Sequence, residues 1–286
     1  MSDSQLLPIP YPSTTTQPEK AFLLYLPQGY ESSSTQSWPV LLFLHGDGER
    51  GDTLDDLDYL LVLGPLYEAW IQKRDLPFII ISPQLGLLGR DKDGPEYLAQ
   101  RTRTKIPARL EQGVPAHTPD YPSREMAGEM TGAVAAETIP PPHPLIENKM
   151  WDQADPDVIH ILDFVLDHYR VDRQRVYLTG VSLGGFGAWH FASRYPERFA
   201  AILPVVGFGT VEQAEIIAEA GIPIWAFSGG RDLTVQTQYF FPAMKKLDEL
   251  GAVFRFTTEQ DMTHDVWNRT YAREDVYRWL LQYRKS

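Results

Sequence analysis

The five residues Gly180-Val181-Ser182-Leu183-Gly184 are the part of the chain that points most directly to chemistry. They match G-x-S-x-G, in which a sharp turn between a strand and a helix lifts a serine hydroxyl out of the sheet. Residues 174–179 (QRVYLT) are short and β-prone, and residues 183–194 read as a helix, so the motif has that context. Glycine is needed at both ends of the motif because side chains there would collide across the turn. The sequence therefore predicts that Ser182 is a nucleophile.

A serine hydroxyl is a poor nucleophile at neutral pH, so an adjacent base must take its proton. His264 lies in the segment Met262-Thr263-His264-Asp265-Val266-Trp267, a loop between the last predicted strand and the last predicted helix. The other six histidines end a strand, lie in an irregular stretch or lie within predicted helices: His45, His117, His143, His160, His168 and His190. We therefore expect His264 to be the base.

The base must in turn be oriented by an acid, which accepts a hydrogen bond from the imidazole and stabilises it once charged. Asp232 directly follows the predicted strand at residues 222–228 and lies between Ser182 and His264 in the chain. Glu259, Asp261 and Asp265 are alternatives because they neighbour His264. They fall on or beside the same loop as the base, which makes the geometry less natural. Asp232 is therefore the favoured acid.

Attack on a carbonyl creates an oxyanion, which two preorganised backbone N–H groups usually stabilise. The N–H of Leu183, at the start of the predicted helix, is the natural first donor. The second is expected in the glycine-rich loop at residues 45–51 (HGDGERG), at Asp47. The alternative is that this loop is only a turn after a strand. Its place at the carboxyl end of a buried strand favours the oxyanion hole.

Strands and helices alternate along the chain, which predicts an α/β fold with a mostly parallel sheet covered on both faces. The predicted strands are residues 21–27, 38–45, 77–83, 174–179, 200–206, 222–228 and 253–257, and the predicted helices are residues 60–73, 157–169, 183–194, 236–250 and 273–283. The pattern predicts a single domain over residues 1–286.

One long segment interrupts this alternation. Residues 85–149, after the strand at residues 77–83, are rich in Pro, Gly, Thr and charge, and form a predicted insertion. Within it a helix is predicted to carry Met126, Met130 and Val134. The insertion leaves the sheet at the edge where α/β proteins bind ligands, which makes it a candidate lid or cap. A surface excursion without a catalytic part is the alternative.

Composition excludes several classes of function. The net charge of -12 in 286 residues argues against nucleic acid and anionic membrane surfaces as partners. With no cysteine, the chain has no disulfide or thiolate metal site. No signal peptide is visible and no apolar run reaches the ~20 residues of a membrane span, so a cytoplasmic location is expected. A chain already trimmed of a leader is the alternative.

Four motifs in this order resemble one known family: LFLHGDGERG, TGVSLGGFGAWHFASRYPERFAAILPVVGFG, SGGRD and THDVW. They resemble the α/β-hydrolase serine esterases of the group related to polyhydroxybutyrate depolymerases, feruloyl esterases and predicted prolyl-oligopeptidase-like peptidases. The resemblance implies the α/β-hydrolase fold, with Ser182 as nucleophile, Asp232 as acid and His264 as base. It covers nearly all the chain except the N-terminal segment and the insertion.

The expected activity is hydrolysis of small or medium carboxylic esters, aryl esters included, through an acyl-enzyme on Ser182. This chemistry needs no metal or organic cofactor, and no metal-ligand spacing such as H-E-x-x-H appears. Trp267, three residues from His264, is a candidate for the substrate pocket, with core packing as the alternative. A serine peptidase of the same fold and a non-catalytic binding protein are the rival functions. The sequence leaves the oligomeric state open.

Overall fold

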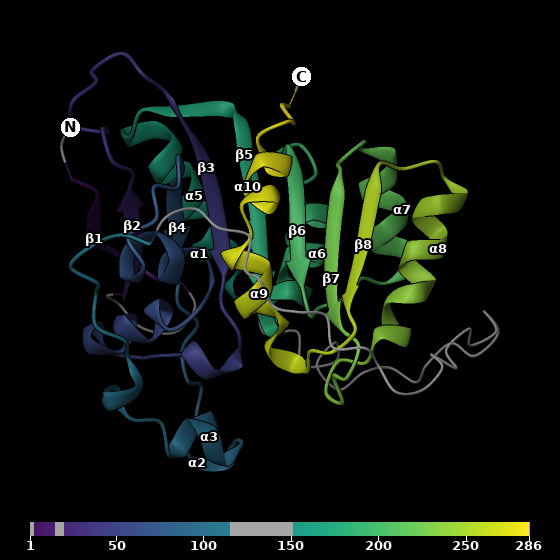
Figure 1. The fold of residues 1–286 in the computed structure, drawn as a ribbon, viewed down its shortest axis with the longest axis horizontal. Coiled ribbons are helices and arrows are strands. Elements are labelled where there is room, and N and C mark those ends of the chain that lie inside the picture. The colour runs from purple at the N-terminus through teal and green to yellow at the C-terminus, as the bar shows by residue number, and fades with distance from the viewer. Residues whose placement is uncertain (1–2, 15–19, 115–150, 286) are drawn as a thin grey trace.

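A single mixed sheet organises the chain (Figure 1). The structure is a computed structural model and describes residues 3–14, 20–114 and 151–285. Within these residues the strand order is β1-β2-β4-β3-β5-β6-β7-β8. The strands are β1 (Gln5–Tyr11), β2 (Lys20–Leu26), β3 (Trp38–Leu44), β4 (Ile79–Ser82), β5 (Val171–Val181), β6 (Ala201–Val205), β7 (Ile224–Gly229) and β8 (Phe254–Glu259). From β4 across to β8 neighbouring strands are parallel, whereas β1 and β2 form an antiparallel edge.

Helices cover both faces of this sheet, as Figure 1 shows with α9 and α10 in front of it and α6 behind. The helices are α1 (Gly64–Leu66), α2 (Arg90–Asp93), α3 (Glu96–Ala99), α5 (Asp155–His168), α6 (Leu183–Arg194), α7 (Val211–Glu219), α8 (Phe241–Glu249), α9 (Trp267–Ala272) and α10 (Glu274–Leu280). Helices α5 to α8 pack into one hydrophobic core, and α1, α9 and α10 into a second core on the opposite face. The predicted α/β class is confirmed.

Strand β3 shows how the sequence produces this layering. Its residues alternate between the two cores, with Val40, Leu42 and Leu44 in one and Leu41 and Phe43 in the other, and all five are fully buried. A near-continuous apolar run is what a parallel strand covered on both faces requires. The predicted central strand at residues 38–45 is thereby confirmed.

The single helix predicted over residues 60–73 is wrong. This stretch contains the end of a 3-10 segment (Leu54–Leu61), then α1, then a π-helical turn (Tyr67–Ile71). Gly64 has φ +78, a left-handed conformation that a continuing helix does not contain. Pro65 follows it and lacks the N–H that a helix interior needs. Proline is tolerated in the first turn of a helix, so a new helix, α1, begins at this point.

Several elements were not predicted: β1, α7, α9, and α2 and α3 in the insertion. Strand β1 contains Pro8 and Pro10, which weaken a strand signal but are tolerated because β1 is the edge strand and pairs only with β2. Helix α7 is capped by Thr210, whose side chain accepts from the Gln213 N–H while the Gln213 side chain accepts from the Thr210 N–H. That capping box is written in the sequence as T-x-x-Q and could have revealed the helix.

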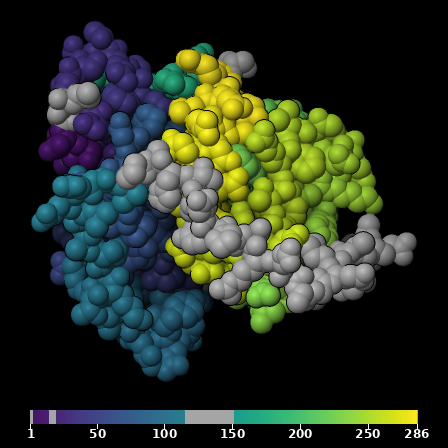
Figure 2. Space-filling model, in the orientation of Figure 1, coloured from purple at the N-terminus to yellow at the C-terminus, as the bar shows by residue number. Residues whose placement is uncertain are grey.

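The insertion is described up to residue 114, and this part holds α2, α3 and a 3-10 turn (Arg103–Lys105) but no strand. It forms the projection at the lower left of the molecule in Figure 2. The predicted helix with Met126, Met130 and Val134 lies outside the described residues, as do His117 and His143. In the described part of the chain, no helix has the length and apolar character needed to cross a membrane.

Candidate active site

Ser182 lies in a strained turn between β5 and α6. Its φ is +51° and its ψ is -114°, a conformation that costs a non-glycine residue about 1–3 kcal/mol and that clusters at functional sites. The turn is held on both sides, because the Ser182 N–H donates to the Val205 carbonyl at 2.9 Å and its own carbonyl accepts from Phe186 at 3.1 Å. The hydroxyl is therefore carried at the carboxyl edge of the sheet by a fixed backbone.

The glycines flanking this turn have no room for a side chain. A Cβ on Gly180 would lie 2.2 Å from the carbonyl oxygen of Gly184, and one on Gly184 would lie 1.9 Å from the carbonyl oxygen of Leu44. Both contacts are with backbone atoms, which cannot move aside as a flexible side chain could. Side chains at these two positions would therefore collide, as expected from the sequence. The close approach of Leu44 also shows that the end of β3 lies against the serine turn.

Ser182, His264 and Asp232 form a continuous chain of hydrogen bonds. The Ser182 hydroxyl is 2.9 Å from Nε2 of His264, and Nδ1 of the same ring is 2.6 Å from Oδ2 of Asp232. The Asp232 side chain is fully buried, and its Oδ1 accepts from the N–H groups of Thr234 at 2.7 Å and Val235 at 2.9 Å. The carboxylate is thus fixed by its own loop, and it fixes the imidazole in turn.

The three alternative acids have other partners. Arg269 donates to Glu259 at 2.8 Å and binds Asp261 through both terminal nitrogens at 2.7 and 2.8 Å. Asp265 accepts from the hydroxyl of Thr263 at 2.8 Å. Of the four acids that the sequence offers, Asp232 is the one bonded to His264. Arg269 was not singled out from the sequence, yet it ties together the loop that carries the histidine.

His45 lies near the site but is unsuited to be the base. It is fully buried, and Nδ1 lies 2.5 Å from the Gly46 carbonyl while Nε2 accepts from the Leu85 N–H at 2.9 Å. Burial lowers the pKa of His45 to about 3. The ring is therefore neutral at pH 7, and both nitrogens serve to hold the loop after β3.

That loop lies directly against the serine turn. A Cβ on Gly46 would be 3.6 Å from the carbonyl oxygen of Val181, the residue before the serine. The side chain of Asp47 points to the insertion, where it binds Arg90 at 2.9 Å and Tyr97 at 2.7 Å, and to Arg50 at 2.6 Å. Burial alone would raise the pKa of Asp47, but these three hydrogen bonds outweigh burial and lower it. No sequence pattern indicated this anchoring.

Trp267 lies beside the base. Its ring meets that of His264 edge to face, with centroids 5.3 Å apart. It also lines a pocket of about 480 Å³ together with Tyr67, Gln72 and Asn268. The residue is partly buried. Among the described residues, no group of three or more His, Asp and Glu side chains could hold a metal ion.

Glu49 makes stability depend on pH. Its side chain is in the loop after β3, its Oε2 is buried without a hydrogen-bond partner among the described residues, and burial raises its pKa to about 7. The stability that its neutral form contributes is present below pH ~4.5 and is lost as pH rises through about 7. Relative to Glu49→Gln, the wild type should lose up to about 3 kcal/mol between pH ~5 and ~8. Urea unfolding of both proteins across this range tests it, and parallel profiles would contradict it.

Comparisons with known proteins agree with the observed fold. Residues 144–225 match the prolyl oligopeptidase family (Peptidase_S9). A bifunctional acetylxylan esterase/xylanase from Neocallimastix patriciarum is 26% identical over 122 residues, 43% of this chain and 17% of that protein. A thermostable esterase superposes with a TM-score of 0.63 at 23% identity, over 98% of this chain and 63% of that one. A ferulic acid esterase superposes with a TM-score of 0.55 at 15% identity, over 98% and 97% of the two chains.

The matches cover different shares of this chain and of the proteins that it resembles. The chain spans less than a fifth of the esterase/xylanase that it matches and about two thirds of the thermostable esterase. The family match contains Ser182 and ends before Asp232 and His264. At these identities the structural likeness shows the fold, and it extends over nearly the whole chain. The chain therefore has the α/β-hydrolase fold, and parts of its sequence are similar to the prolyl oligopeptidase family and to an esterase/xylanase.

Proposed function

We propose that this protein hydrolyses carboxylic esters through a covalent acyl-enzyme on Ser182. The observation that carries the proposal is the hydrogen-bonded chain from the Ser182 hydroxyl through His264 to the buried carboxylate of Asp232. A nucleophile, a base within hydrogen-bond distance and a group that orients the base are the three parts that serine catalysis needs.

In the proposed mechanism, His264 removes the proton from Ser182 as its oxygen attacks the ester carbonyl. The backbone N–H groups of Leu183 and Asp47 are the proposed donors to the oxyanion, and Asp232 stabilises the charged imidazole. His264 then gives its proton to the departing alcohol. Water, activated by the same histidine, attacks the acyl-enzyme and releases the acid, which restores the serine.

Small and medium esters, aryl esters among them, are the proposed substrates, with Trp267 contacting the part of the substrate near the histidine. The edge-to-face contact of Trp267 with the His264 ring, at a centroid distance of 5.3 Å, supports this role. A peptidase of the same fold is the second candidate, favoured by the match of residues 144–225 to the prolyl oligopeptidase family.

Two assays test the proposal. The first follows p-nitrophenyl esters from acetate to laurate, a feruloyl ester and a panel of peptide p-nitroanilides. The second labels the protein with a fluorophosphonate probe, which reacts only with an activated serine. We expect labelling at Ser182 together with ester turnover. Labelling with turnover of anilides alone would instead show a peptidase, and a protein that neither labels nor turns over would be a binding protein.

A further inference from the structure

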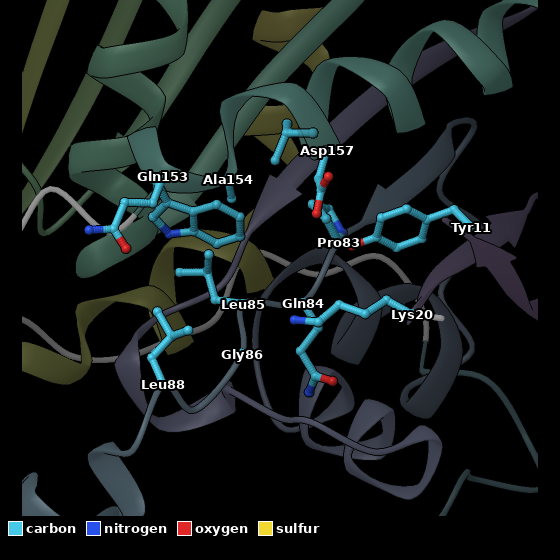
Figure 3. Close-up of a pocket in the computed structure, with 12 residues that line it drawn as sticks. Tyr11, Lys20, Pro83, Gln84, Leu85, Gly86, Leu88, Gln153, Ala154 and Asp157 are labelled. Atoms are coloured by element: carbon cyan, nitrogen blue, oxygen red, sulfur yellow. The ribbon is translucent and has the colours of Figure 1, made fainter. Parts of the chain in front are cut away.

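A second pocket lies beside the proposed active site. It has a volume of about 360 Å³ and combines a polar end with an apolar one (Figure 3). Its apolar wall includes Trp151, Leu85 and Leu88. Trp151 packs edge to face on the ring of His45, with centroids 5.1 Å apart, and Leu85 donates its N–H to the same ring. Two residues that line the pocket therefore contact His45, which is two residues before Asp47 in the chain.

At the polar end, Lys20 extends its side chain into the pocket and Tyr11 faces it from the neighbouring strand (Figure 3). Among the described residues, neither the Lys20 ammonium nor the Tyr11 hydroxyl has a hydrogen-bond partner. Both groups come from the antiparallel edge, since Lys20 begins β2 and Tyr11 ends β1.

The carboxylate that lines the pocket already accepts several hydrogen bonds. Asp157 accepts from the Ser13 hydroxyl at 2.5 Å through one oxygen, and from the N–H and hydroxyl of Thr14, both at 2.8 Å, through the other. The side-chain nitrogen of Gln84 donates to the carbonyls of Glu49 and Asp56. The Lys20 ammonium is thus left in the pocket as a cation whose donors have no partner among the described residues.

The Lys20 ammonium can only donate, so it fits a ligand group that only accepts, and a carboxylate is such a group. The charges around Lys20 also favour an anionic ligand. Burial lowers the pKa of Lys20 and Arg50 adds to this, while Asp52 and Asp157 offset it only in part. An anion bound at Lys20 would compensate the remaining cost of burying the ammonium.

The sheet topology places the polar end of the pocket at the same edge of the sheet as Ser182. Strand β2 runs antiparallel to β4 with Leu23 opposite Ser82, so Lys20 lies past the carboxyl end of β4, at the same edge of the sheet as Ser182. The strand order β2-β4-β3-β5 puts three strand spacings between them, about 14 Å. We propose that this pocket binds the carboxylate end of an elongated ester whose other end is cleaved at Ser182. This inference rests on the proposed esterase function.

The test compares matched esters that differ only in their far end. They are the p-nitrophenyl esters of hexanoate, octanoate and decanoate and the p-nitrophenyl half-esters of adipate, suberate and sebacate. In Lys20→Met the ratio of kcat/KM for a half-ester to that for its uncharged partner should fall about ten- to hundredfold. Tyr11→Phe should lower it less. Lys92→Met, on an exposed lysine of α2, is the control and should keep the wild-type ratio. An unchanged ratio in Lys20→Met would overturn the proposal.

A binding measurement separates this inference from the esterase proposal. Calorimetric titration of Ser182→Ala with methyl hydrogen suberate needs no turnover, and the Ser182→Ala/Lys20→Met protein is its partner. Weaker binding by the double variant supports the carboxylate pocket even if no ester is cleaved by the wild type. Absent binding, or equal binding by the two proteins, overturns it.

Discussion

Ser182→Ala should lower kcat/KM for ester hydrolysis by about four to six orders of magnitude. The variant keeps the oxyanion donors, the base and the acid, but it has no atom that can form the acyl-enzyme. Alanine also removes the hydroxyl that lies 2.9 Å from His264 without adding bulk to the turn. Steady-state kinetics on the preferred p-nitrophenyl ester gives the loss, and circular dichroism shows whether the fold is kept.

Two further variants give this prediction its controls. Ser193→Ala lies on the same helix, with its hydroxyl bonded to the His190 carbonyl, and should hydrolyse esters at the wild-type rate. His264→Ala should lose nearly as much activity as Ser182→Ala, and the double variant should lose little more, because residues that act as a unit are not additive. Additive losses, or substantial activity in Ser182→Ala, would show that another group is the nucleophile.

Asp232→Asn should reduce kcat by about 10⁴-fold while leaving the fold intact. The amide can still accept from the N–H groups of Thr234 and Val235, so the loop keeps its geometry. What is lost is the charge that fixes the imidazole tautomer and stabilises its protonated form. The neutral side chain can present an N–H to Nδ1 and so place the imidazole proton on Nε2, where it cannot accept the proton of Ser182.

Asp265→Asn is the matched control, because Asp265 is next to His264 in the chain but bonds to Thr263. It should keep activity within about twofold of the wild type, since an exposed carboxylate is largely screened by water. If the two variants lost activity equally, the acid would be shared between them. If only Asp265→Asn lost activity, Asp232 would have a structural role alone.

The proximity of Ser182, Asp232 and His264 could be predicted because it follows from local signals and topology. Each follows a strand, and parallel strands present their carboxyl ends at one edge of the sheet. The helix at residues 183–194 was predicted with the bounds that the structure gives, because the G-x-S-x-G motif fixes where it starts.

Other features depend on contacts that no local pattern records. The break at Gly64 and Pro65 was visible in the sequence, but an apolar helical period over residues 60–73 concealed it. The buried Glu49 and the ties from Arg90 and Tyr97 to Asp47 arise only when distant segments meet. Contacts of this kind leave no periodic pattern in the sequence, so they could not be predicted from it.

The ties between the insertion and the loop after β3 also decide where the chain can be re-engineered. Besides Arg90 and Tyr97, Arg101 bonds to the Arg50 carbonyl and to Asp56, and Arg103 bonds to Asp58. Residues 86–105 therefore brace the backbone that would hold the oxyanion, and shortening them would strip that brace away. A fused domain or an affinity tag belongs instead at the exposed turn around Gly251, which precedes the amino end of β8 and so lies at the edge of the sheet opposite to the one with Ser182.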